Sequence, residues 1–228
     1  MLPIYLYGNP VLRKTAEEIT LDYPDLSSLI DEMFDSMKKA EGVGLAAPQI
    51  GLSIRLFIID TAPFQELYPN EEAIQEVFIN PKIEEYLGED FSFNEGCLSL
   101  PDIHEEVIRK SEVIISYTDR SGNQLKKHFK GMAARVIQHE YDHLEGLVFT
   151  DRVSQLKKMI LKKKLSEISS GKKKPSINVM NCSCRGDTFA LLFVIINEIL
   201  ENLMEKSTES IEGDASIGDR VNMAFANS

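Results

Sequence analysis

The sequence predicts an α+β fold, in which mixed or antiparallel β-sheets pack around a central helix and a further helix follows at the C-terminal end. Two observations predict this fold class. Apart from one early helix, the segments before residue 131 are short apolar or alternating runs around turn signals, whereas later apolar residues recur at helical spacing. Strands that precede helices, with antiparallel turns between them, are typical of α+β proteins rather than of a doubly wound parallel sheet.

The N-terminal elements follow from local patterns. Residues 25–41 are predicted to form a helix that stops at Gly42, because apolar side chains recur every three or four positions. Residues 55–60 and 76–83 are short apolar runs, which indicate buried strands. Residues 105–130 contain two alternating segments around the turn signal DRSGN, which indicates a β-hairpin.

Two helices are predicted in the second half of the chain. Helical spacing extends from Met132 to Glu145, and Gly146 supplies a C-terminal stop. The next helix is predicted from Ser154, a good N-cap residue, to about Ile168. The first of these helices carries two histidines and a glutamate, and we expect it to be the central one.

Composition and charge limit the classes of protein that the chain can represent. With 228 residues, of which 43% are hydrophobic, the chain can bury a core of ordinary domain size. A formal net charge of −11 argues against nucleic-acid binding by the whole surface. The chain has three cysteines, no visible secretory signal, and no apolar run longer than residues 189–196. The expected location is therefore cytoplasmic, without membrane contact.

The composition changes near residue 171, where a lysine-rich segment with a proline indicates the end of the first domain. We therefore expect one domain over residues 1–175 and an atypical extension over residues 176–228. Residues 182–228 hold three basic and eight acidic residues. Residues 188–206 have the spacing of an amphipathic helix, and the polar remainder is expected to be disordered.

The segment QHEYDHLEG, residues 138–146, places His139 and His143 four positions apart on the predicted central helix. Residues at this spacing lie on one face, so both imidazoles can bind one metal ion. Glu140 lies one step around the helix, where its carboxylate can take a proton from water on that metal. The H-E-x-x-H pattern is typical of metal hydrolases, although a motif with three fixed positions also occurs by chance.

A catalytic site of this kind usually has three protein ligands, and the third must come from elsewhere. A histidine six residues after His143 is excluded, because that position is Phe149. Glu167 on the following helix would complete the ligand set of a metalloprotease. Cys97 in the segment NEGCLSLP would supply a thiolate, which binds zinc or ferrous iron well. A lone cysteine is also commonly a small buried side chain, so the residues alone leave both Glu167 and Cys97 open as the third ligand.

Three segments together resemble the signature motifs of the peptide deformylase family, in its bacterial type. They are GVGLAAPQ at residues 42–49, EGCLS at 95–99 and QHEYDHLEG at 138–146, in the order and at the spacing of that family. Each motif alone has limited specificity, whereas the ordered set is highly specific. The resemblance also includes PVLRKTAEEI near the start and the predicted hairpin, so it covers about residues 1–175.

The resemblance implies hydrolytic removal of the formyl group from N-formylmethionine at the start of newly synthesised polypeptides. It implies that Glu140 acts first as general base and then as general acid. The side-chain amide of Gln49 and the backbone N–H of Leu98 would stabilise the oxyanion, since prepositioned neutral donors do so without adding a titrating group. The implied metal ligands are Cys97, His139 and His143.

The resemblance also implies roles in substrate binding and in supporting the metal site. Gly44 and Leu45 would pair with the substrate backbone as the edge of a sheet does. Val136 and the stem of Arg135 would help form the pocket for the methionine side chain, although helix packing and a solvated arginine explain them equally well. The expected supporting residues are Glu95, its ion-pair partner Arg109, and Asp142, which would orient a ligand histidine unless it is an exposed helix acid.

The sequence also gives expectations about the metal, about binding partners and about two rival functions. The resemblance favours Fe²⁺, while two nitrogens and a thiolate also suit Zn²⁺, Ni²⁺ or Co²⁺. Eight lysines and one acid lie between residues 157 and 174, so the helical region 154–174 is either a solvated face or a surface that docks on ribosomal RNA, as in some deformylases. The rivals are a metalloprotease that depends on Glu167 and not on Cys97, and a peptide-binding module without chemistry, which would require a broken motif.

Overall fold

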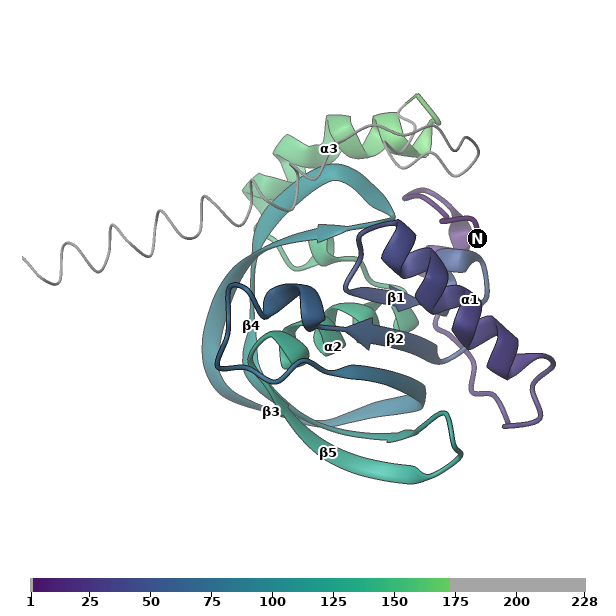
Figure 1. Ribbon diagram of the computed structural model, residues 1–228. Coiled ribbons are helices and arrows are strands. Elements are labelled where there is room, and N and C mark those ends of the chain that lie inside the picture. Colours follow the sequence, from purple (N-terminus) through teal and green to yellow (C-terminus); the bar gives the residue numbers. More distant parts are fainter. Residues whose placement is uncertain (1, 173–228) are drawn as a thin grey trace, which may run out of the picture. The chain divides into compact units, whose positions relative to one another are not determined.

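The computed structural model describes residues 2–172, and Figure 1 shows their arrangement. Helix α2 (Gly131–Leu144) lies inside the curve of the strands. Within the described residues, the strands form one antiparallel sheet in the order β1-β2-β3-β4-β5. The strands are β1 (Gly44–Ala46), β2 (Leu56–Asp60), β3 (Gln75–Cys97), β4 (Leu100–Thr118) and β5 (Gln124–Lys130). The predicted α+β fold around a central helix is therefore confirmed.

Two further helices cover other parts of the sheet. Helix α1 (Leu26–Lys39) packs on β1 and β2, and helix α3 (Gln155–Ser169) lies across the bend of the β3–β4 hairpin (Figure 1). The side chain of Ser154 accepts a hydrogen bond from the backbone N–H of Lys157, so the predicted N-cap of α3 is confirmed. Short 3-10 helices connect these elements: η1 (Pro10–Arg13), η2 (Ala47–Ile50), η3 (Ala62–Phe64) and η4 (Phe149–Asp151).

Strand β2 separates two apolar clusters, because its side chains alternate between the two faces of the sheet. Phe57 and Ile59 point to the cluster that contains the apolar face of α2, whereas Leu56 and Ile58 point to the cluster under α1. All four side chains are fully buried. Burial of each such side chain stabilises the folded state by roughly 1.5–3 kcal/mol, so α2 is held firmly against the sheet.

Helix α2 ends as the sequence predicts. Gly146 adopts the left-handed conformation at φ 70°, and the backbone N–H of Leu147 donates to the carbonyl of Asp142 at 2.9 Å. Helix α1 differs in detail, because Glu41 and not Gly42 takes the left-handed position, at φ 56°. The N–H of Gly42 then closes the helix on the carbonyl of Met37 at 2.9 Å.

Strands β3 and β4 are much longer than the sequence predicts. The prediction ended the first strand at residue 83 and began the hairpin at residue 105, whereas pairing continues through Glu95↔Glu105 to Cys97↔Leu100. The added stretch is rich in exposed acidic residues and glycine, which have low β propensity. Pairing between distant segments therefore overrides local preference, and it places Cys97 at the end of a strand.

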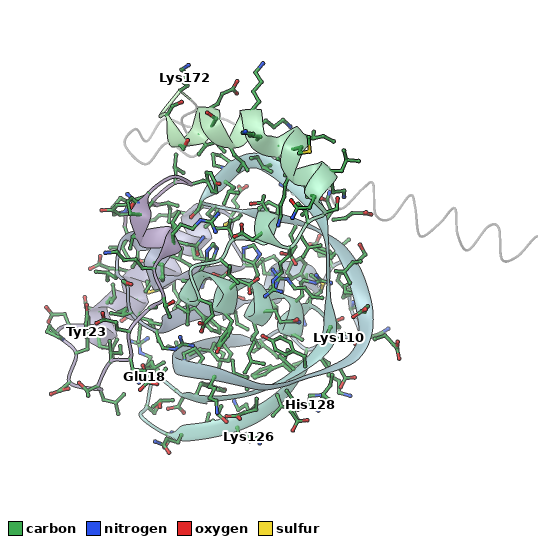
Figure 2. The ribbon with its side chains drawn as sticks, turned by 180° about the vertical axis from the view of Figure 1, so that it is seen from behind. Glu18, Tyr23, Lys110, Lys126, His128 and Lys172 are labelled. Carbon is green, nitrogen blue, oxygen red and sulfur yellow. The ribbon has the colours of Figure 1, made fainter. Side chains whose placement is uncertain are left out.

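Several other expectations concern the surface and the ends of the chain. His104 on β4 and His128 on β5 are exposed, and Figure 2 shows His128 on the outside of the molecule. None of the helices within residues 2–172 has both the length and the apolar character needed to cross a membrane. The predicted domain boundary at 175 and the amphipathic segment 188–206 lie outside the described residues.

Candidate metal centre and active site

Cys97, His139 and His143 meet where the end of β3 passes over α2. Their ligand atoms all lie within 4.8 Å of one another, and Cys97 Sγ is 3.3 Å from His143 Nε2. The two histidines share one face of α2 because they are four residues apart. One sulfur and two nitrogens in this arrangement suit a divalent metal with one coordination position left for a reactant. The donor set therefore fits the metal that the sequence implies.

The charges of these groups also suit a metal. Burial alone would raise the pKa of Cys97, but the adjacent His143 and His139 lower it to about 5, which favours the thiolate. Burial opposes protonation of His139, yet the neighbouring Cys97 and Glu95 raise the pKa of its imidazole. The site thus concentrates negative charge next to two imidazoles, and a bound cation would neutralise that charge.

Glu95 orients His139. Its Oε2 lies 2.9 Å from His139 Nδ1, which leaves Nε2 to face the metal position. The carboxylate also accepts from Arg109 at 2.6 and 3.0 Å and from Arg135 at 2.9 Å. Although burial opposes ionisation, His139 and Arg109 hold the pKa of Glu95 well below its usual range. Glu95 is therefore an anion that accepts the Nδ1 proton, and its predicted pairing with Arg109 is confirmed.

Asp142 does not have the role that the sequence suggests. Its carboxylate accepts from Arg109 at 2.8 Å and from Arg152 at 2.6 Å, and within residues 2–172 it bonds no histidine. It is also only 2% exposed, so the interpretation as an exposed helix acid is wrong too. Two residues separate the Asp142 carboxylate from His139: Asp142 bonds Arg109, Arg109 bonds Glu95, and Glu95 bonds His139.

Glu140 lies on α2 directly after His139 and beside the Cys97–His139–His143 cluster. Its side chain is 4% exposed, and within residues 2–172 its Oε2 has no hydrogen-bond partner. Burial raises the pKa of Glu140 to about 7, so near neutral pH the group can both take up and release a proton. A Cβ built on Gly44 would lie 2.7 Å from Glu140 Cδ, so the carboxylate rests directly against this glycine. An unpaired oxygen on a buried carboxylate can accept a hydrogen bond, and then a proton, from a reacting water molecule.

The amide nitrogen of Gln49 points toward the Cys97–His139–His143 cluster. Its Oε1 accepts from the backbone N–H of Ala46 at 2.8 Å, which fixes the orientation of the amide. Its Nε2 then lies 3.5 Å from Cys97 Sγ and 3.4 Å from Ser99 Oγ. Leu98 occupies the tight connection between β3 and β4, directly after Cys97, and is partly buried. The expected donors therefore lie next to the ligand cluster.

Strand β1 forms the edge of the sheet beside this cluster. Gly44 and Leu45 pair with Ile59 and Ile58 of β2, and within the described residues the other side of β1 has no strand partner. Val136 is 5% exposed and belongs to the cluster around α2.

Arg135 is 3% exposed, so its interpretation as a solvated arginine is wrong. Its guanidinium group bonds Glu95 and the carbonyl of Val107, and it lies over the rings of Phe91 and Phe93 at 5.0 and 5.8 Å.

A comparison with known protein families decides the identity. Residues 1–159 match the family model described as polypeptide deformylase. The chain belongs to the polypeptide deformylase family. Peptide deformylases from Christiangramia forsetii and Flavobacterium johnsoniae are 50% and 51% identical over 179 residues, which cover 75% of this chain and 91% of each relative.

Solved structures agree. Peptide deformylase 1B of Arabidopsis thaliana, in complex with an inhibitor, matches with a TM-score of 0.67 and 35% identity, over 77% of this chain and 96% of that one. A peptide deformylase from Legionella pneumophila matches with a TM-score of 0.65 and 37% identity, over 77% and 99% of the two chains. This deformylase is therefore an enzyme of the bacterial type.

The family assignment removes the rival interpretations. Glu167 lies on α3 and is not a member of the metal-binding group found within the described residues, so the metalloprotease ligand set is wrong. Sequence reasoning missed three residues of this deformylase. Ser99 accepts from Gln49, Arg152 donates to Asp142, and Glu71 accepts from the backbone N–H of Met132 in the first turn of α2. Only Ser99 had a signal, because it lies within the motif that contains Cys97.

Proposed function

We propose that this deformylase hydrolyses the formamide of N-formylmethionine at the start of newly synthesised polypeptides. The observation that carries the proposal is the combination of a Cys-His-His donor set with a buried carboxylate, Glu140, whose Oε2 has no partner within residues 2–172. A metal ligand set alone would also suit a structural site. An adjacent carboxylate that can exchange a proton near neutral pH favours hydrolysis.

Cys97, His139 and His143 would hold the metal. A divalent ion bound there supplies two effects: it makes water more acidic and it polarises the formyl carbonyl. Glu140 removes a proton from the attacking water and later delivers that proton to the leaving amine. The carbon–nitrogen bond of the formamide breaks, and the products are formate and a peptide with a free amino terminus.

Two donors of the chain stabilise the negative charge that forms on the formyl oxygen. They are Nε2 of Gln49 and the backbone N–H of Leu98. The hydrogen bond from Ala46 to Gln49 Oε1 keeps the amide from flipping, so a donor and not an acceptor faces the oxyanion. Loss of one such donor typically costs about 10²–10³ in rate.

The substrate backbone would extend the sheet at β1. Gly44 and Leu45 lie on a strand edge that pairs with no other strand in residues 2–172, and main-chain pairing of this kind suits many peptide sequences. Val136 would line the pocket for the methionine side chain. Arg135 would contribute only its aliphatic stem, because its guanidinium group is bonded to Glu95.

Release of formate from formyl-Met-Ala-Ser by metal-loaded protein tests the proposal. We expect Glu140→Gln to lose about 10²–10⁴ in kcat, the range for loss of a positioned acid–base group, while it still binds metal. Glu145→Gln at the end of the same helix is the matched control, since Glu145 pairs with Arg55 away from the ligands. Full activity of Glu140→Gln, or no activity of the wild type with either ferrous iron or nickel, would refute the function.

The identity of the metal is a separate part of the proposal. We favour Fe²⁺, on the resemblance, and the donor set also suits Zn²⁺, Ni²⁺ and Co²⁺. Elemental analysis of protein purified without oxygen measures this directly. One iron per chain is the expected result, and stoichiometric zinc with little iron would contradict the assignment.

Helix α3 is proposed to dock on ribosomal RNA, which would place this deformylase near new polypeptides in the cytoplasm. Its exposed lysines Lys162, Lys163 and Lys164 support this, and Figure 2 shows Lys172 beyond the end of the helix. Because phosphate binding releases counterions, pelleting with ribosomes should weaken steeply as salt rises. Replacement of these three helix lysines by glutamine should abolish pelleting. Binding that is independent of salt and of the lysines would refute the docking.

A further inference from the structure

A chain of alternating charges leads from the surface to a metal ligand. The side chain of Arg152 is 38% exposed, and it holds both oxygens of Asp142, one of them from Nε at 2.6 Å. Asp142 accepts from Arg109 Nη1 at 2.8 Å, and Arg109 donates to both oxygens of Glu95 at 2.6 and 3.0 Å. Glu95 Oε2 lies 2.9 Å from His139 Nδ1. Arg152 is thus the outer end of a chain whose inner end is an imidazole.

The inner members of this chain have little freedom to compensate for a change at the outer end. The side chains of Arg109, Glu95 and Asp142 are only 2–4% exposed, so in the intact structure their orientations depend on one another and not on bulk water. Asp142 Oδ2 accepts from Arg152 and from Arg109 together. Without Arg152, the Asp142 carboxylate can rotate, and the planar Arg109 that it holds can tilt away from Glu95.

We propose that Arg152 is a positioning residue that fixes the orientation of His139 through Asp142, Arg109 and Glu95, and thereby slows release of the metal. The inference rests on the proposed metal site. Partners of ligand histidines typically change metal affinity by about 10–100-fold when removed. Because Arg152 acts three residues further out, we expect a smaller effect, roughly threefold to tenfold faster release.

The chain offers a closely matched control. Arg13 pairs with Asp151 at 2.5 Å, and its side chain is 41% exposed, so it resembles Arg152 in chemistry and exposure, while Asp151 is 32% exposed and Asp142 only 3%. Asp151 directly precedes Arg152, so both pairs tie η4 to neighbouring parts of the structure. However, the other contacts of Arg13 and Asp151 within residues 2–172 include the Tyr7 ring, the carbonyl of Gly146 and the N–H of Val148, and none of these leads to Glu95. Loss of Arg13 therefore tests a structural effect alone.

The experiment uses the full chain loaded with Co²⁺. The rate of cobalt release to excess chelator and the visible cobalt bands would be compared for wild type, Arg152→Gln, Arg152→Lys and Arg13→Gln. Arg152→Gln should release cobalt about threefold to tenfold faster, with altered cobalt bands. Arg152→Lys keeps the charge without the two-pronged geometry and should fall between it and the wild type. Arg13→Gln should keep the wild-type rate and bands even if its Tm falls.

Each outcome decides between the proposals. The wild type should show a thiolate–cobalt band, and Cys97→Ala should remove it. Absence of that band from the wild type, or its persistence in Cys97→Ala, would refute the metal site itself. A normal wild type with wild-type release from Arg152→Gln would refute only the positioning role. Equal acceleration in Arg13→Gln would also refute it, because the effect would then be a general loosening. If Arg152→Gln does not fold, wild-type release from Arg152→Lys overturns the inference and faster release supports it.

Discussion

Gly44→Ala is a sharp test of the active-site geometry, because it adds a single methyl group next to the proposed proton carrier. The backbone of Gly44 does not have the positive φ that would strain an alanine, so the added Cβ is the only local change. That Cβ would lie 2.7 Å from Glu140 Cδ and 2.8 Å from Cγ, whereas ordinary contact begins at 3.4 Å. Glu140 Oε1 would be closer still, so the carboxylate must move by at least about 0.7 Å (3.4 Å less 2.7 Å), or β1 must shift by as much.

The size of the effect follows from that displacement. A misplacement of about 1 Å can cost 10²-fold in rate, so 0.7 Å should reduce kcat by roughly tenfold to a hundredfold. Forcing Glu140 off its preferred rotamer costs about 0.5–1.5 kcal/mol, and overpacking in this buried place costs about 1–3 kcal/mol. We therefore expect a folded, slightly less stable protein with wild-type metal content and low activity.

Formate release, metal analysis and thermal unfolding would be measured on the same preparations. Gly42→Ala is the matched control, because its Cβ would lie 3.1 Å from Leu98 Cδ1 and 3.3 Å from Met37 Cγ, while the nearest backbone atom, the carbonyl oxygen of Gly44, stays in ordinary contact at 3.5 Å. Its kcat should stay within about threefold of the wild type, since such side chains can shift by a few tenths of an ångström. If Gly44→Ala keeps more than half of the wild-type kcat, the placement of Glu140 against this glycine is not important for catalysis.

Three other perturbations have distinct expected results. Glu71→Ala should lower the free energy of unfolding by about 1 kcal/mol, because its carboxylate caps α2 through the N–H of Met132 at 2.8 Å. Urea unfolding checks this against exposed Glu72→Ala, and equal losses would contradict it. Arg109→Met should cost about 3–5 kcal/mol in the same assay, since two buried carboxylates lose their shared cation, and a loss under about 1 kcal/mol would show that they do not need it. Removal of metal by a chelator should lower Tm, because a ligand at about 100 times its Kd stabilises the folded state by roughly 2.7 kcal/mol. Cys97→Ala protein should show almost no such shift.

Local patterns predicted the elements that bury one apolar face. The spacing in α1, α2 and α3 and the alternation in the β4–β5 hairpin are properties of short segments, so the sequence shows them directly. Ser154 and Gly146 also predicted their caps correctly, since capping depends on one residue and its neighbours. Of the three expected metal ligands, a local pattern predicts only His139 and His143, which lie on one helix.

Other features depended on pairing between distant segments. The outer half of β3 forms because it pairs with β4, and its acidic residues gave no strand signal. Charged residues are usually exposed, so the local pattern alone did not favour burial of Arg135 and Asp142 over exposure. Glu71 caps a helix 61 residues away in sequence, which no local motif can show.

The buried charges support the metal site rather than the stability of the fold. Burying an ion costs several kcal/mol, and this cost is offset only if its partners are complete, as they are for both oxygens of Glu95. Apolar side chains of similar volume would often give equal or greater stability at such a position. They could not accept the Nδ1 proton of His139, however. The ionised Glu95 is therefore best explained by the need to orient that imidazole, and Arg109 by the need to keep Glu95 ionised. Changes at Arg109 should then reduce metal retention and stability together, whereas changes at Arg13 should reduce stability alone.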